Sequence, residues 1–263
     1  TTTARSSPSI RAAARKIRDD MERSGARFVL AFLDEVCVPD SRWNLGTERM
    51  RADYSQLLER VLSDPELGLI LKPKSPSRLM RNLGPLGELL ARATATGRCR
   101  VLAEGRLASA HPPAEAALAA DVTINGNLWS GTAGIEAALA GCRTLILDHD
   151  RWDRSPLYGL GVGKVICRDW SEIWEAVAKL RTGKGPGFEE IGNWDSLLPE
   201  LDPFRDGRAA QRMGQCLNSL LDGFSEGLGR DDCLQRAAEG YARRWGADKI
   251  LYQTGKSPME ILA

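Results

Sequence analysis

The sequence predicts an α/β fold built on a parallel β-sheet, because short apolar runs alternate with longer amphipathic stretches along most of the chain. The apolar runs are continuous rather than alternating in polarity, as expected for strands that helices cover on both faces. Strand-helix alternation implies right-handed crossovers, and hence a Rossmann-like domain over residues 26–183. The six expected strands are residues 27–33, 67–71, 99–103, 121–124, 143–147 and 164–167.

The stretches between these runs carry the features of helices. One helical face of residues 50–62 bears four apolar side chains, at Tyr54, Leu57, Leu58 and Val61. Gly141 is placed to end a helix over residues 130–140, and Ser171 is placed to cap one over residues 171–180. The other expected helices are residues 10–24, 78–94 with an interruption at Gly84-Pro85, 113–120, and two within 207–244.

Changes in composition divide the chain into three parts. Residues 1–25 form a tail and a helix, residues 26–183 form the Rossmann-like domain, and residues 184–263 form a helical extension after a Gly-rich break. We expect this extension to pack on the same domain or on a partner domain. Because 263 residues are too few for two full domains of this kind, we expect a second Rossmann-like domain in a longer chain.

Charge and cysteine content exclude several classes of function. The 36 basic and 35 acidic residues nearly cancel, so no overall basic excess favours a nucleic-acid backbone or an anionic membrane. The six cysteines lack the spacing of metal ligands, so we expect free thiols in a reducing compartment and no bound metal. No apolar run approaches the ~20 residues of a membrane span. We therefore expect a cytoplasmic protein, peripheral to the inner membrane only through its partners.

The loop after the fourth expected strand is the strongest candidate for a ligand site. Ligands of open parallel sheets bind at the carboxyl ends of the strands, and here the chain enters a helix through Ser130, Gly131 and Thr132. A helix start offers unpaired N–H groups and the positive end of the helix dipole, and glycine lets the backbone approach a ligand closely. These residues suit a phosphate group, although Ser and Thr are also ordinary helix N-caps.

The segment SGTAGIEAALAGCRTLILD around this helix resembles the corresponding segment of GT-B glycosyltransferases and of the related nucleotide-sugar 2-epimerases. The resemblance implies that the Ser-Gly-Thr turn contacts the donor phosphates and that Glu136 binds a ribose or sugar hydroxyl. Arg143 departs from the pattern, since proline is common there. Over about residues 27–248, the chain also resembles a bacterial surface-carbohydrate biosynthesis family.

A second candidate follows the second expected strand, where the sequence LILKPKS delivers Lys72 and Lys74. Burying a lysine is costly, so both amino groups are expected to face solvent or an anion. The Lys-Pro-Lys sequence resembles a motif of capsule- and teichoic-acid-type polysaccharide transferases, where it meets the donor phosphate. An ordinary basic turn is the alternative.

Polar residues near the ends of other strands complete the set of candidates. Asp34 and Glu35 follow the first strand and are the candidate catalytic carboxylates. His111 precedes a helix and Asp148 ends the fifth strand, and both are candidate nucleotide or sugar ligands. A solvated loop is the alternative for Asp34, Glu35 and His111. The turn LDPFRDGRA forms either a salt-bridged helix entry or part of a site, and its candidates are Arg205, Asp206 and Arg208.

These residues lead us to expect the donor-binding half of a metal-independent GT-B glycosyltransferase that builds a bacterial surface polysaccharide or lipopolysaccharide. The donor phosphate is expected between Lys72 and Lys74 and the helix start at residues 130–132, where charge on the leaving nucleotide is stabilised. The donor is a nucleotide sugar, with the CMP-Kdo type as one class, the acceptor is a glycan or glycolipid, and no cofactor or nucleic acid is expected. The alternatives are an enzyme like the nucleotide-sugar 2-epimerases and a non-catalytic domain that binds a nucleotide sugar or a partner.

Overall fold

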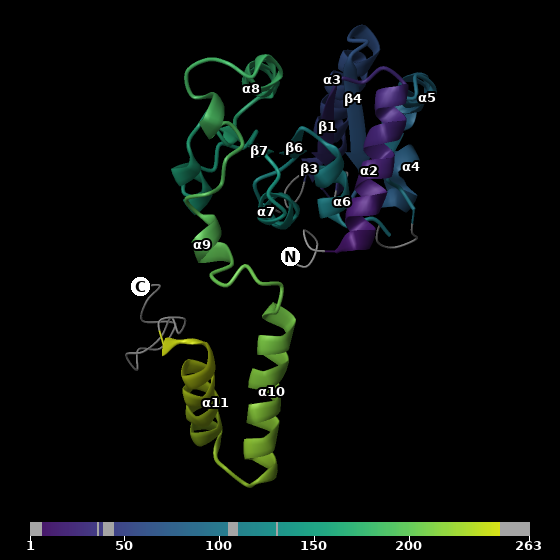
Figure 1. The fold of residues 1–263 in the computed structure, drawn as a ribbon. Helices are drawn as coiled ribbons and strands as arrows, with labels where there is room; N and C mark the ends of the chain where they lie inside the picture. Colours follow the sequence, from purple (N-terminus) through teal and green to yellow (C-terminus); the bar gives the residue numbers. More distant parts are fainter. Residues whose placement is uncertain (1–6, 36, 39–44, 105–109, 130, 248–263) are drawn as a thin grey trace. The chain divides into compact units, whose positions relative to one another are not determined.

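The computed structural model describes residues 7–35, 37–38, 45–104, 110–129 and 131–247. The chain divides into two compact units at the junction between Asp202 and Pro203. Within the described ranges, the first unit contains the strands, and the second contains two long helices (Figure 1). The candidate chemistry after each strand therefore belongs to the first unit.

The first unit is built on a six-stranded, entirely parallel sheet. When only the strands of this sheet are numbered, in chain order, their spatial order is 3-2-1-4-5-6, which is the order of a Rossmann fold. The predicted α/β class with a Rossmann-like parallel sheet is therefore confirmed. In spatial order the strands are β5 (Cys99–Val101), β4 (Leu67–Lys72), β1 (Phe28–Leu33), β6 (Val122–Asn125), β7 (Thr144–Leu147) and β8 (Ile166–Cys167).

The two edge strands are shorter than the sequence predicts. β5 stops at Val101 rather than continuing to residue 103, and β8 begins only at Ile166. The chain before β8 turns instead, because Val165 N and Ile166 N both donate to Gly161 O. A small parallel pair also forms where the sequence predicts only a loop, and its strands are β2 (Cys37–Val38) and β3 (Leu45–Gly46).

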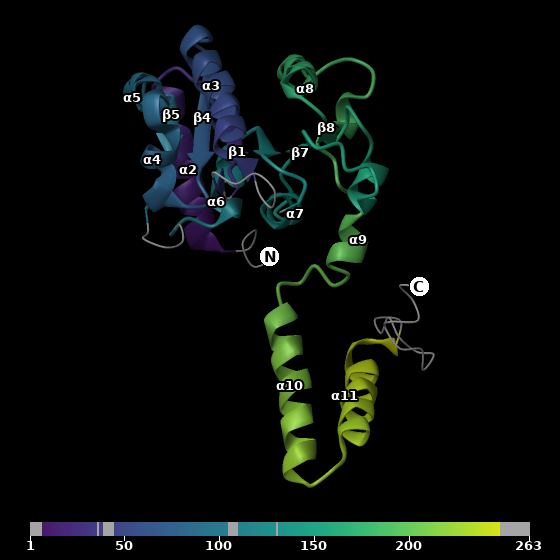
Figure 2. The same ribbon diagram turned by 180° about the vertical axis from the view of Figure 1, so that it is seen from behind.

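Helices cover both faces of the sheet. The main ones are α2 (Pro8–Arg23), α3 (Thr47–Ser63), α5 (Gly87–Ala95), α6 (Pro113–Ala119), α7 (Thr132–Leu139) and α8 (Trp170–Thr182). Successive side chains of a strand point to opposite faces, so Leu30 and Phe32 of β1 pack with α3, α5 and α8. Val29, Ala31 and Leu33 pack with α2, α6 and α7. The two views show α2 and α3 on opposite sides of β1 and β4 (Figure 1; Figure 2).

The helix expected over residues 78–94 is broken, as its Gly-Pro pair predicts. α4 (Leu79–Leu83) ends at Gly84, which has a φ of 55° and begins a 3-10 turn before α5. Proline cannot donate the next helical hydrogen bond, and glycine tolerates the positive φ. The remaining short elements are α9 (Leu198–Leu201) and the 3-10 turns η1 (Pro76–Arg78), η2 (Gly84–Leu86), η3 (Pro156–Leu160) and η4 (Phe188–Glu190).

The second unit is a hairpin of α10 (Ala209–Ser225) and α11 (Arg230–Trp245), and it matches the two helices expected within residues 207–244. The helices approach closely at a glycine, since a Cβ on Gly223 would lie 2.8 Å from Cys233 Sγ. Across the described residues, no helix combines the length and the apolar character needed to cross a membrane. One face of α10 exposes large apolar side chains, at Met213, Leu217, Leu221 and Phe224.

A tightly packed glycine in β4 gives a test of the core. A Cβ on Gly68 would lie 2.9 Å from Met21 Cε and 3.0 Å from Val29 Cγ2. We predict that Gly68→Val lowers the free energy of unfolding of the first unit by about 1–3 kcal/mol, because the added side chain overpacks the space under α2. Gly159→Ala is the control, since its Cβ would meet no atom within 4 Å. Equal stability of the two variants in chemical denaturation would contradict this packing.

Candidate functional site

The sheet reverses its strand order between β1 and β6, which are paired with Leu33 opposite Asn125. β4 and β5 lie on the β1 side of this point, and β7 and β8 lie on the β6 side. The two loops therefore diverge at the carboxyl edge, which is where ligands of open α/β sheets bind. Gly126 keeps the exit of β6 close against β1, since a Cβ there would lie 2.8 Å from Phe32 Cζ.

Asp34, the first residue after β1, is buried at this edge. Its N–H donates to Lys72 O at 3.1 Å, and its Oδ2 accepts a hydrogen bond from Tyr54 Oη at 3.0 Å. Its pKa is raised to about 7, mainly by burial. The Tyr54 hydrogen bond opposes this rise, and the negative charges of Glu35 and Asp53 add to it. Asp34 therefore exchanges a proton near neutral pH, as a general acid or base must.

Lys72, at the end of β4, is a buried cation at the same edge. The residue is only 8% exposed, and no residue that the structure describes forms a hydrogen bond or ion pair with its Nζ. Burial lowers the pKa of Lys72, and exposed Lys74 lowers it further. The charges of Glu136, Glu35 and Asp34 oppose the shift. A cation on a largely buried side chain is costly when no direct partner compensates it, so this position suits an anionic ligand.

The start of α7 follows the β6 loop directly. Gly131 is the N-cap residue, and its carbonyl accepts a hydrogen bond from Ile135 N at 2.8 Å. Thr132 is the first helical residue and is exposed. Gly131 supplies no side chain to cap the first turn, so the helix start keeps the N–H groups that the sequence analysis assigned to a phosphate. Ser130, the third member of that turn, lies outside the described residues.

Two other predicted ligands meet at the start of α6. Glu136, half-buried on α7, accepts a hydrogen bond from Ala114 N through Oε1 at 3.1 Å. His111 lies just before α6, with Nδ1 2.9 Å from Glu115 Oε1 and Nε2 3.6 Å from Glu104 Oε2. The structure thus brings Glu136 to the helix that His111 precedes, and it holds the imidazole between two carboxylates.

Asp148, after β7, is turned into the protein. Its Oδ2 accepts hydrogen bonds from Trp152 N at 2.8 Å and from Tyr158 Oη at 2.6 Å. Burial and this hydrogen bond to Asp148 raise the pKa of Tyr158 to about 12. Asp148 therefore stabilises the loop after β7 through these hydrogen bonds. Direct contact between Asp148 and a ligand stays a prediction.

A buried carboxylate that the sequence analysis overlooked adjoins the site. Asp53, on α3, accepts a hydrogen bond from Trp170 Nε1 at 2.7 Å, and its Oδ1 lies 2.9 Å from His149 Nε2. Its Oδ2 is buried, with no hydrogen-bond partner in the described part of the chain. Asp53 stands beside Tyr54 on the apolar face of α3, and a carboxylate on such a face is the sequence feature that marks it.

Asn125, the last residue of β6, is a second overlooked group. It is fully buried, and its Nδ2 donates to Asn127 O, whereas its Oδ1 has no partner among the described residues. A Cβ on Gly134 would lie 3.1 Å from Asn125 Cβ, so this glycine lets α7 pack closely on the end of β6. An amide at the carboxyl end of the strand sequence VTIN is the sequence feature that points to it.

The charged turn before α10 belongs to the second unit. Asp206 accepts hydrogen bonds from both terminal nitrogens of Arg212, at 2.8 and 2.9 Å, and from Arg208 N at 2.9 Å. The Arg212 guanidinium lies 3.8 Å from the centroid of the Phe204 ring and holds the pKa of Asp206 well below its usual range. Asp206 and Arg208 thus fix the start of α10, and Arg205 lies in the turn that leads to it.

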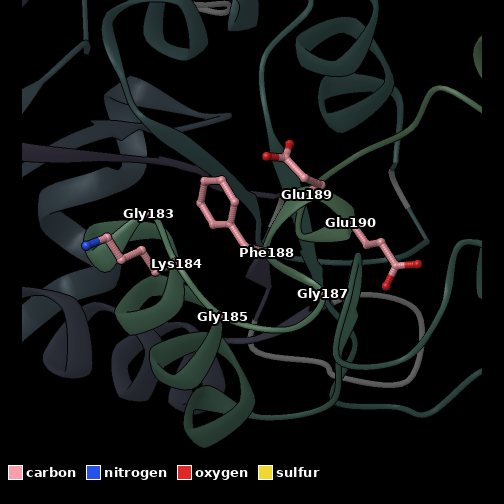
Figure 3. A pocket seen from close by; sticks show the side chains of 7 residues that line it. All are labelled: Gly183, Lys184, Gly185, Gly187, Phe188, Glu189 and Glu190. Carbon is pink, nitrogen blue, oxygen red and sulfur yellow. The ribbon is translucent and has the colours of Figure 1, made fainter.

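A surface pocket lies at the opposite edge of the sheet. Arg143, just before β7, donates to Phe188 O at 3.1 Å and to Ile191 O at 2.6 Å, which ties the pocket to the amino ends of the strands. Figure 3 shows the charged ends of Lys184 and Glu190 pointing away from each other. Because this pocket lacks convergent polar groups and lies away from the carboxyl edge, we do not assign it as the site. Its lining residues are Gly183, Lys184, Gly185, Gly187, Phe188, Glu189 and Glu190.

Comparison of the chain with models of known protein families, with curated proteins and with solved structures found no match. The chemistry of the site is therefore argued from its own groups. In the parts of the chain that the structure describes, no three His, Cys, Asp or Glu side chains gather as ligands of a metal ion. The site combines a buried cation, a carboxyl group that titrates near neutrality and an open helix start.

The raised pKa of Asp34 predicts an unusual dependence of stability on pH. The folded state holds this proton up to a pKa of about 7, compared with an ordinary value of 3.8, so it binds more protons than the unfolded state between these values. The free energy of unfolding should therefore fall as the pH rises from about 4 to about 7. Asp34→Asn should remove that loss and gain on the order of 2–4 kcal/mol over the wild type near neutral pH.

Urea unfolding at a series of pH values measures this effect. Asp195→Asn is the matched control, because Asp195 is an exposed carboxylate of the same unit. Its curve should follow that of the wild type. If Asp34→Asn kept the pH dependence of the wild type, the buried state of this carboxyl group would be refuted.

Proposed function

We propose that this chain is the donor-binding domain of a glycosyltransferase that transfers a sugar from a nucleotide-activated donor to a glycan or glycolipid of a bacterial surface polysaccharide. The observation that carries the proposal is the largely buried Lys72, unpaired among the described residues, beside the switch point of a Rossmann-like sheet. Carboxylates act on it electrostatically, and no described residue pairs with it directly. A phosphate at this position would satisfy the cation.

In this proposal the donor phosphate lies between the lysines and the start of α7. Lys72 and Lys74 supply positive charge from the end of β4, and the N–H groups after Gly131 add the positive end of the helix dipole. Negative charge grows on the leaving phosphate as the bond to the sugar breaks. Fixed cations and dipoles in a partly dry crevice stabilise that charge, so the proposed transfer needs no bound metal.

Asp34 is the proposed general base. The oxygen of the acceptor hydroxyl forms a bond to the anomeric carbon while the bond from that carbon to the donor phosphate breaks, and the electron pair stays on the phosphate. Asp34 takes the hydroxyl proton, a role that its pKa of about 7 suits. The negative charges of Glu35 and Asp53 help to keep its proton affinity high.

Glu136 and His111 are the proposed contacts for hydroxyl groups of the donor. Among the described residues, only Oε1 of Glu136 is engaged, by Ala114 N, so its Oε2 is available to a ribose or sugar hydroxyl. His111 stands at the same helix start, next to Glu115. A carboxylate and an imidazole together accept and donate hydrogen bonds, as recognition of a vicinal diol requires.

The exposed apolar face of α10 is the proposed contact for a second Rossmann-like domain, which would bring the acceptor. Contiguous apolar side chains on a surface commonly mark contacts with other protein surfaces. The side chains concerned are Met213, Leu217, Leu221 and Phe224.

Ligand-induced stabilisation tests the phosphate site. A ligand at ~100 times its Kd raises the free energy of unfolding by about 2.7 kcal/mol, so we predict a higher melting temperature with at least one of CMP, CDP, UDP and GDP. Lys72→Met should weaken that nucleotide by about 10- to 100-fold, because it removes a charged hydrogen bond to phosphate. Lys184→Met is the control, since this exposed lysine lies at the opposite edge. No shift with any nucleotide, on folded protein, would refute the proposal.

Turnover tests the role of Asp34. With the nucleotide sugar of the donor class that binds, Asp34→Asn should keep nucleotide affinity and lower the rate of sugar transfer by about 10²- to 10⁴-fold, as expected for loss of a general base. The rate of the wild type should rise with pH through a pKa near 7. Nucleotide binding with a transfer rate that Asp34→Asn leaves unchanged would refute the catalytic role. Binding without any transfer would favour a non-catalytic nucleotide-sugar module.

A further inference from the structure

Two exposed tryptophans stack on each other at the carboxyl edge of the sheet. The rings of Trp129 and Trp152 lie with centroids 4.8 Å apart and planes 12° from parallel. Trp129 is 64% exposed and Trp152 is 42% exposed. Indole rings are large apolar surfaces that usually lie buried, and an exposed cluster of them commonly marks a binding surface.

Hydrogen bonds from the ends of two neighbouring strands hold the loops that carry this pair. Trp129 N donates to Asn127 Oδ1 at 2.7 Å, and Asn127 O accepts a hydrogen bond from Asn125, the last residue of β6. Trp152 N donates at 2.8 Å to the buried Asp148, which follows β7. Because β6 and β7 are paired in the sheet, these anchors bring the two indoles together.

The pair also lies close to the proposed phosphate site. Trp129 precedes Gly131 by two residues, so their Cα atoms are at most about 7.6 Å apart, twice the spacing of consecutive Cα atoms. A nucleoside diphosphate has a flat aromatic base at one end and phosphates at the other. A nucleoside diphosphate therefore fits this surface, with its base on an exposed indole and its phosphates at the helix start.

We propose that Trp129 and Trp152 form the stacking surface for the nucleobase of the donor, an inference that rests on the proposed function of the site. The base lies on an exposed indole face, and the diphosphate reaches the start of α7 and Lys72. Stacking on an aromatic side chain tolerates every base, because each base has a π-face. Nucleoside diphosphates with different bases should therefore bind through this surface with similar affinity, and the sugar and its contacts should decide donor specificity.

Parallel titrations with a nucleoside diphosphate and with inorganic pyrophosphate separate this inference from the proposed function. Pyrophosphate has the phosphates without the base, so its binding reports the phosphate site alone. Calorimetry on the wild type, Trp129→Ala and Trp129→Phe gives both affinities. Trp129→Ala should raise the Kd of UDP and GDP by about 5- to 150-fold, which corresponds to a stacking energy of about 1–3 kcal/mol. The same variant should leave the Kd of pyrophosphate unchanged.

Trp129→Phe is the matched variant, because it keeps an aromatic face and should restore most of the UDP affinity. Trp152→Ala is the second truncation, and it should weaken UDP but not pyrophosphate. UDP should also quench tryptophan fluorescence in the wild type and less in Trp129→Ala. If both truncations left UDP affinity unchanged while pyrophosphate bound, the base-stacking role would be refuted and the phosphate site would stand. If neither ligand bound the folded wild type, the proposed function would fail and this inference with it.

Discussion

The reversal of strand order between β1 and β6 is the constraint on which the rest of the site depends. Leu33 pairs with Asn125 at the point where the two loops diverge, so Asp34 and the β6 loop leave the same edge in opposite directions. Asp34 is further tied to the end of β4, because its N–H donates to Lys72 O. The neighbouring strands β4, β1 and β6 therefore bring a cation, a carboxyl group and a helix start to one edge of the sheet.

The same edge concentrates charge that the fold alone does not need. Burial raises the pKa of Asp34 and lowers that of Lys72, which means that burial disfavours the charged form of both groups in the folded protein. Asp53 adds a third buried ionisable group, partly compensated by His149 and Trp170. Apolar side chains at these positions would give a more stable protein. Such a concentration of destabilising groups at one edge of a sheet is typical of functional sites, where activity requires groups that lower stability.

The sequence predicts the strands well, because a parallel sheet covered on both faces needs continuous apolar runs, and FVLAFL and LGLILK are such runs. It also predicts that Asp34 and Lys72 lie at the carboxyl ends of the first and second strands. It cannot give the strand order, which tertiary packing decides, nor the partners of Asp148, whose Oδ2 is taken by Trp152 N and Tyr158 Oη. Asp53 lies inside α3 rather than after a strand, so a search for ligands at the ends of strands does not reach it. The stacking of Trp129 on Trp152 joins residues of two loops, and no local pattern reveals such a contact.

Burial and exposure divide the proposed site into two ends with different tasks. At the buried end, low solvent access raises the pKa of Asp34, and in the proposed transfer it would strengthen the electrostatic attraction between Lys72 and the leaving phosphate. At the open end, Trp129 and Trp152 offer flat apolar surface without enclosing a ligand. An open stacking surface binds different bases with similar affinity. Charged contacts depend more strongly on the position and orientation of the ligand. Discrimination between donors would then fall to Glu136 and His111, the proposed hydroxyl contacts, whose hydrogen-bonding groups can distinguish one arrangement of hydroxyls from another.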